Sequence, residues 1–188
     1  MIISKISDFK LFLYAISLFL IIRIFFLIDG VILNNFTSYW QIANIDLLHK
    51  DLFKTIYYFH YQPPLWNLLI GFILKITNGN QEIGKYILLF FHWFLSIGII
   101  FLTYKIQKKA KFIKIIYVIG LLLIILNPSI IFYENFPLYN HLSCFIFFLI
   151  FYNFYSLSPK KKFKYEFFVF ILSLILTLTW PLFHPVFL

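Results

Sequence analysis

Five long runs of apolar residues, separated by short polar segments, make up most of the chain. They cover residues 11–28, 83–104, 115–132, 136–157 and 167–183. Each is close to the length of about 17–25 residues that an α-helix needs to cross a bilayer. A sixth apolar run covers only residues 65–76, and runs that short are more often re-entrant or interfacial. The pattern predicts an all-α fold, a polytopic transmembrane helix bundle of about five spans.

The segment between the first two spans, residues 29–82, predicts a loop that contains short juxtamembrane helices. Apolar residues from Tyr39 to Leu48 recur at near-helical spacing, and Thr37 or Ser38 is placed to cap the start of that helix. A second short helix is expected directly after Asp51. Helices of this kind lie flat on a bilayer surface.

Two adjacent prolines, Pro63 and Pro64, interrupt this loop. Proline cannot continue a helix and restricts the residue before it to extended backbone. The pair therefore redirects the chain into the short helix 65–76, and the turn residues Asn78-Gly79-Asn80 end that helix. Just before the prolines, His60 and Gln62 are presented on non-helical backbone beside the membrane. Such backbone is tolerated only under protein or beside a watery cavity, so the stretch is a candidate site.

Basic residues gather in three places next to the apolar runs, which is typical of cytoplasmic loops. If the run 65–76 does not cross, all three groups share one side with the amino terminus. That side then holds eleven of the 16 basic residues: Lys5, Lys10, Lys105, Lys108, Lys109, Lys111, Lys114, Lys160, Lys161, Lys162 and Lys164. The outer side holds Lys50, Lys54, Lys75 and Lys85, together with five of the seven acids, Asp29, Asp46, Asp51, Glu82 and Glu134. This outer position of the acids suggests that carboxylates are used there.

Composition supports the membrane assignment and excludes other classes. Hydrophobic residues make up 62% and charged residues 12% of the chain, and its mean hydropathy is +0.90, whereas soluble domains average about 45–50% apolar and about 25% charged. The single cysteine, Cys144, excludes a disulfide framework and any site with several cysteine ligands. The net charge of +9 is confined to the loops beside the membrane, so nucleic acid is not expected as a partner.

We expect one transmembrane domain over residues 1–188: a retained first span at 1–28, the outer loop at 29–82 and four further spans at 83–188. The first apolar run is too long for a usual signal peptide and no small-residue cleavage site follows it. The predicted location is the plasma membrane, the inner membrane in a bacterium, with the amino terminus in the cytoplasm.

Arg23, His92 and His141 lie more than one helical turn inside the predicted spans. Arg23 would cost a few kcal/mol in the bilayer unless it reaches the interface or is paired. We expect it to reach the outer interface, the alternative being a contact with a substrate phosphate. His92 and His141 are expected to make hydrogen bonds between helices.

The order of these features resembles the GT-C membrane glycosyltransferases, and more specifically the branch that includes protein O-mannosyltransferases and the aminoarabinose transferase of lipid A. The resemblance rests on an acidic residue after the first span, a juxtamembrane loop with Tyr39 and Trp40, the stretch His60-Tyr61-Gln62-Pro63-Pro64-Leu65, and the Gly79 turn with Glu82. Three later stretches fit it as well: Asn127-Pro128-Ser129 with Tyr133-Glu134-Asn135, then Pro137-Leu138-Tyr139, and Leu182-Phe183-His184-Pro185.

The resemblance implies transfer of a sugar from a polyprenyl-phosphate donor to an acceptor glycan, lipid or protein, assisted by an acid in the first outer loop. Asp29 is the first choice for that base, with Asp46 next and Asp51 after it. Substrate-binding residues would be His60, Gln62, Tyr39, Glu134 and His184. Glu134 follows the helix break at Asn127-Pro128 and is either a helix-end residue or a pocket wall. A divalent metal ion held by carboxylates and histidines on the outer face stays an open alternative, but no close spacing of these residues requires one, and no cofactor is assigned.

Several features depart from that family. Its members are longer, so the chain resembles an amino-terminal portion, and a folded but inactive fragment is one outcome. Trp180 stands where a basic residue is expected, and Lys85 stands where an arginine is common. The competing hypothesis is a small non-enzymatic membrane protein that serves transport or assembly. Transporters tend to carry ionisable residues at the midplane and to show internal repeats, and the sequence shows no such repeat.

Overall fold

The computed structural model of the chain describes residues 6–31, 42–58, 63–110, 113–156 and 162–179. The regular structure in these ranges is entirely helical, as the sequence predicts. The helices are α1 (Asp8–Ile28), α2 (Ile45–Lys50), α3 (Leu52–Tyr58), α4 (Pro64–Ile76), α5 (Gln81–Ala110), α6 (Lys114–Leu126), α7 (Pro128–Glu134), α8 (Asn140–Tyr155) and α9 (Lys162–Thr179).

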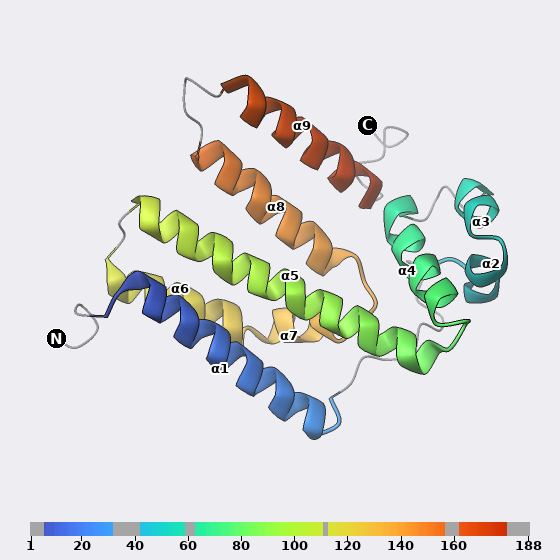
Figure 1. Cartoon of the computed structure of the whole chain (residues 1–188), viewed down its shortest axis with the longest axis horizontal. Coiled ribbons are helices and arrows are strands. Elements are labelled where there is room, and N and C mark those ends of the chain that lie inside the picture. Colours follow the sequence, from blue (N-terminus) through green and yellow to red (C-terminus); the bar gives the residue numbers. More distant parts are fainter. Residues whose placement is uncertain (1–5, 32–41, 59–62, 111–112, 157–161, 180–188) are drawn as a thin grey trace.

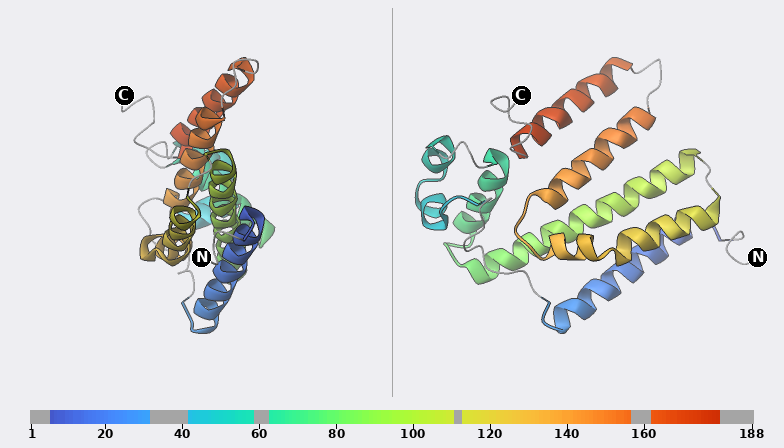
Figure 2. Two further views of the ribbon diagram at one scale, coloured as in Figure 1. Left: turned by 90° about the vertical axis from the view of Figure 1, so that its left-hand side faces the viewer. Right: turned by 180° about the vertical axis from the view of Figure 1, so that it is seen from behind.

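The long helices form a thin, two-layered arrangement. Helices α1, α5, α8 and α9 lie side by side in that order, and each packs on the next (Figure 1). Helices α6 and α7 lie behind this row, where α6 packs on α1 and α5, and α7 packs on α5 and α8 (Figure 2, right). The short helices α2, α3 and α4 pack together beside the start of α5, and α4 also contacts α9. The edge-on view in Figure 2 shows how little depth the layers have.

Successive long helices run in opposite directions, which separates two ends of the molecule (Figure 1). One end holds the starts of α1, α6 and α9 and the ends of α5 and α8; we call it the lysine end, because its described basic residues are Lys10, Lys105, Lys108, Lys109, Lys114, Lys162 and Lys164. The other end holds the end of α1 with Asp29, the helices α2 to α4 and the start of α5; we call it the loop end. The described members of the three basic regions therefore lie at one end of the molecule.

Within the described residues, α1 and α5 are each long and apolar enough to cross a membrane. The pair α6 and α7 makes a third candidate if it counts as one span bent by 44°. Helix α8 has only 16 residues, and α9 begins with Lys162, Lys164 and Glu166, so neither qualifies by itself. The bundle of five spans is thus supported for two or three of its members.

Large apolar side chains on the outside of the helices fit a lipid environment. On α1, Ile21, Phe25 and Ile28 are 64%, 62% and 81% exposed, and on α6 Leu123 is 65% exposed. Soluble proteins rarely leave contiguous apolar surface of this kind uncovered. The exposed apolar surface of the described helices is therefore compatible with the membrane class that the composition indicates.

The proline pair acts as predicted. Pro63 is the residue before α4 and Pro64 is its first residue, a position where the missing proline N–H has no helical partner to lose. The helix ends before Asn78 and Gly79, which adopt positive φ angles of 50° and 78° and reverse the chain into α5.

The first juxtamembrane helix begins later than predicted. The described part of that segment is not helical at Ile42 and Ala43, and α2 starts at Ile45 with Asn44 as its cap, whose side chain accepts a hydrogen bond from the Leu47 N–H. Ile42 and Ala43 are instead buried against α4, where the Ala43 N–H donates to Asn67 Oδ1 over 2.7 Å. The second short helix, α3, begins after Asp51 as expected.

Candidate functional site

The most unusual feature of the interior is a buried ion pair between α1 and α7. Arg23 is 2% exposed and Glu134 is fully buried. The guanidinium binds the carboxylate in a forked arrangement, with Nε donating to Oε2 and Nη2 donating to Oε1. Arg23 therefore does not reach the outer interface as predicted, because a carboxylate 111 residues away along the chain neutralises it inside the bundle.

The break between α6 and α7 explains the remaining contact of Arg23. Pro128 has no N–H to donate, and the Ser129 N–H donates to the side chain of Asn127 at 2.8 Å rather than to the backbone of α6. The end of α6 is thus left with carbonyl groups that lack helical partners. Arg23 Nη1 donates to one of them, the Ile125 oxygen, over 2.9 Å.

Ser96 and His141 complete the surroundings of the carboxylate. The Ser96 hydroxyl donates its proton to Glu134 Oε1. Its oxygen is therefore left to accept, which assigns the proton of the 2.9 Å contact with His141 to Nε2 of that ring. Ser96 lies in α5 and His141 in α8, so the network joins the four helices α1, α5, α7 and α8.

His92 extends the cluster towards α4. Its Nδ1 lies 3.0 Å from the backbone oxygen of Glu134, and since a carbonyl can only accept, Nδ1 carries the proton. The other ring nitrogen, Nε2, is buried and has no hydrogen-bond partner among the described residues. The ring stacks on that of Trp66 with centroids 5.9 Å apart, and the Trp66 indole donates to the Pro137 oxygen.

This cluster is built to hold helices together rather than to receive a substrate. Both carboxylate oxygens of Glu134 already accept hydrogen bonds, and the three nitrogens of the Arg23 guanidinium all donate. The ring of Phe19 covers the guanidinium, with Cζ 4.7 Å from the ring centroid. Glu134 is predicted to bind substrate beside the helix break, and it is the last residue of α7, the helix that follows this break. Its negative charge is instead paired with Arg23 inside the fold.

The predicted bases lie elsewhere, on the surface. Asp29 is exposed and follows the last residue of α1, six residues beyond Arg23 and so about 9 Å further along the helix axis. Asp46 is exposed in the first turn of α2, and Asp51 is exposed between α2 and α3. All three belong to the loop end, and no hydrogen bond or ion pair in the described part of the chain joins any of them to Glu134.

Four of the predicted substrate-binding residues lie outside the described residues. They are Tyr39, His60, Gln62 and His184. Their placement relative to Asp29 is therefore a prediction from the sequence alone.

The histidine predictions are confirmed. His92 and His141 each make a hydrogen bond from one helix to another segment, as expected for polar side chains within a bundle. Sequence reasoning missed Ser96, which is a single serine in an apolar run, and it did not pair Arg23 with Glu134. A usable indication was present, since Arg23 is a basic residue more than one turn inside a predicted span and Glu134 follows a broken helix.

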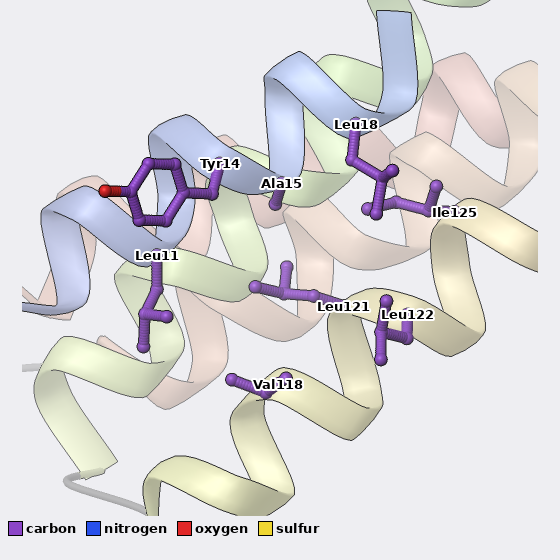
Figure 3. Close-up of a pocket in the computed structure, with 8 residues that line it drawn as sticks. All are labelled: Leu11, Tyr14, Ala15, Leu18, Val118, Leu121, Leu122 and Ile125. Atoms are coloured by element: carbon purple, nitrogen blue, oxygen red, sulfur yellow. The ribbon is translucent and has the colours of Figure 1, made fainter. Parts of the chain in front are cut away.

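Two cavities among the described residues are apolar, and none of the charged or histidine side chains of this cluster lines them. Figure 3 shows one between α1 and α6, about 120 Å³ in volume, in which Tyr14 turns its hydroxyl away from the other lining side chains. A larger one of about 410 Å³ lies between α4, α5 and α8 and is lined by leucine and phenylalanine side chains. No three histidine, cysteine or acidic side chains among the described residues are grouped closely enough to hold a metal ion.

Comparisons of the chain with family models, with curated proteins and with solved structures found no match. The resemblance to the glycosyltransferases therefore stays a prediction from the motifs of the sequence.

Proposed function

We propose that the chain works as an integral membrane glycosyltransferase, which moves a sugar from a polyprenyl-phosphate donor to an acceptor at the membrane surface next to the loop end. The observation that carries this proposal is the separation of charge along the molecule. Seven described lysines mark the lysine end, and the exposed carboxylates Asp29, Asp46 and Asp51 lie at the loop end. By the positive-inside rule the lysine end is cytoplasmic, which directs the loop end outward.

This orientation requires five crossings, with α8 and α9 as complete spans. The protein then lies in a plasma membrane, the inner membrane of a bacterium, with its amino terminus in the cytoplasm. The polyprenyl tail of the donor stays in the bilayer, so the reacting sugar carbon lies at the surface beside the exposed carboxylates.

In the proposed reaction an acceptor hydroxyl oxygen attacks the anomeric carbon, and the bond from that carbon to the phosphate oxygen breaks. The phosphate leaves with the bonding electron pair. Asp29 takes the proton of the hydroxyl, because it is exposed at the end of α1, and Asp46 is the next candidate. Glu134 is not the base in this scheme, since Arg23 and Ser96 bind both of its oxygens.

The test is transfer of a radiolabelled sugar from polyprenyl-phosphate donors in membranes that contain the chain. We expect Asp29→Asn to lower the rate by a factor of about 10²–10⁴, the usual contribution of general-base catalysis. Glu166→Gln is the matched control, because Glu166 is an exposed acid near the lysine end of α9. Unchanged transfer in Asp29→Asn would remove Asp29 from the mechanism.

The buried cluster favours a second candidate, a non-enzymatic membrane assembly protein. Its two charged groups, Arg23 and Glu134, bind each other and their described neighbours, so neither charge is open to a substrate. Absence of transfer from every polyprenyl-phosphate donor, with the protein correctly inserted, would favour this candidate over the transferase.

A further inference from the structure

A groove between α8 and α9 combines an apolar floor with a positively charged rim. It has a volume of about 370 Å³ and is lined by Asn153, Lys164, Tyr165, Phe167 and Phe168. The rings of Phe167 and Phe168 are 57% and 44% exposed, so they offer uncovered apolar surface. The groove opens near the start of α9, which belongs to the lysine end.

A second cation, on α5, lies against the end of α8 and is not among the residues that line the groove. Lys109 Nζ donates to the backbone oxygen of Tyr155 at 2.6 Å and lies 5.2 Å from the centroid of that ring. Tyr155 ends α8, two residues after Asn153. The side chain of Lys109 is exposed, so its ammonium group keeps donors for another ligand. The acid in this part of α9 is Glu166, and it projects in another direction because residues two apart in a helix do not face each other.

We propose that this groove binds an anionic phospholipid, with an acyl chain on Phe167 and Phe168 and the phosphate held by Lys164. Basic pockets between membrane helices on the cytoplasmic side are suited to acidic headgroups. A soluble anion would leave the apolar floor uncovered, and a neutral lipid would offer no negative charge to Lys164. A lipid that has an acyl chain and an anionic headgroup matches both the apolar floor and the charged rim of the groove. This inference needs the chain to lie in a membrane but does not depend on sugar transfer.

The experiment is native mass spectrometry of the purified full chain in detergent, with equal amounts of phosphatidylglycerol and phosphatidylcholine. We expect the protein to retain phosphatidylglycerol preferentially. A lysine beside an anionic lipid surface is worth about a fivefold change in affinity. Lys164→Gln should therefore reduce the preference about fivefold. Lys54→Gln is the control, because Lys54 is an exposed lysine on α3 at the loop end, and it should leave the preference unchanged.

The apolar floor is tested separately. Phe168→Ala should reduce retention of phosphatidylglycerol several-fold, and glycerol phosphate, which carries the charge without acyl chains, should not displace the lipid. Equal retention of the two lipids would overturn the proposal, as would an equal loss of preference in Lys54→Gln. Displacement by glycerol phosphate would also overturn it, because the site would then bind a soluble anion.

Discussion

Arg23 and Glu134 each present a charge that the interior of the bundle would not tolerate alone. Moving a single ion from water into a protein interior costs several kcal/mol even after the surroundings relax. The forked contact offsets that cost, since it joins opposite charges and fills both carboxylate oxygens with help from Ser96. The Ile125 carbonyl gains a donor from the same side chain. One arginine thus neutralises a carboxylate and caps a broken helix.

Removal of one member of this pair is therefore expected to be costly, and removal of both much less so. Glu134→Gln should lower the free energy of unfolding by about 3–5 kcal/mol, because it leaves the Arg23 charge buried without its counter-ion. The double variant Arg23→Met with Glu134→Leu should return to within about 1–2 kcal/mol of the parent. The measurement is denaturant unfolding of the purified protein in detergent micelles.

The ion pair of Lys85 with Glu82 provides a matched control. Its carboxylate side chain is 61% exposed, so Lys85→Gln should change stability by no more than about 1 kcal/mol. An effect of Glu134→Gln as small as that of Lys85→Gln would show that the buried pair contributes little to the fold.

The residues of this cluster could be predicted singly but not as a set. Arg23, Glu134, His92 and His141 are conspicuous in the sequence because each is polar beside or within apolar runs. Their pairing depends on how α1 packs against the broken segment α6–α7, and no local pattern fixes that contact between residues 111 positions apart. Ser96 carries no charge and has no distinctive neighbours in sequence, so only its position in α5 reveals it.

The sequence predicts well those element boundaries that depend on backbone chemistry. Proline at Pro63 and Pro64 sets the start of α4, and Asn78 and Gly79 end it. The start of α2 could not be placed in the same way, because burial of Ala43 against Asn67 replaces helical hydrogen bonds there. Tertiary contacts decided the boundary where local preference was weak.

Two glycines in long helices should respond differently to the addition of a methyl group. A Cβ at Gly98 in α5 would lie 2.5 Å from the ring of Phe145 in α8, whereas a Cβ at Gly120 in α6 would meet nothing within 4 Å. We expect Gly98→Ala to cost about 1–3 kcal/mol, since the rigid ring or the helix must move. Gly120→Ala should be neutral or stabilise by up to about 1 kcal/mol through reduced backbone entropy. Unfolding in detergent measures both, and equal effects would contradict the close approach of α5 and α8.

At the scale of the whole molecule, the alternating direction of the helices explains why lysines far apart in the sequence lie at one end. The sequence predicts that three basic regions share one side, and the fold gathers their described members at one end (Figure 1). The sequence predicts five spans of similar length, whereas the helices of the fold differ in length. Helices α1 and α5 qualify by themselves, α6 and α7 qualify only together as a bent pair, α8 is too short by itself, and α9 is not among the candidates. Helix length in the fold depends on breaks and caps that a count of apolar residues does not resolve.

Whether α8 crosses the membrane can be tested by finding the side on which Lys164 lies. Between Lys108 and Lys164 the chain passes through α6–α7 and then α8. If both segments cross, the two lysines lie on the same side; if α8 does not cross, Lys164 lies on the opposite side. Single cysteines placed at these positions in a Cys144→Ala background can be labelled in intact cells with a maleimide that does not enter them.

We expect Lys108→Cys and Lys164→Cys to react only after the membrane is opened, and Asp46→Cys at the loop end to react before. The physical reason is that exposed lysines are retained on the cytoplasmic side during insertion, whereas acidic residues impose little constraint. Labelling of Lys164→Cys from outside with Lys108→Cys protected would show that α8 stops within the membrane. The end of α9 would then face the cytoplasm, away from Asp29, and the proposed transferase site could not draw on both ends of the chain.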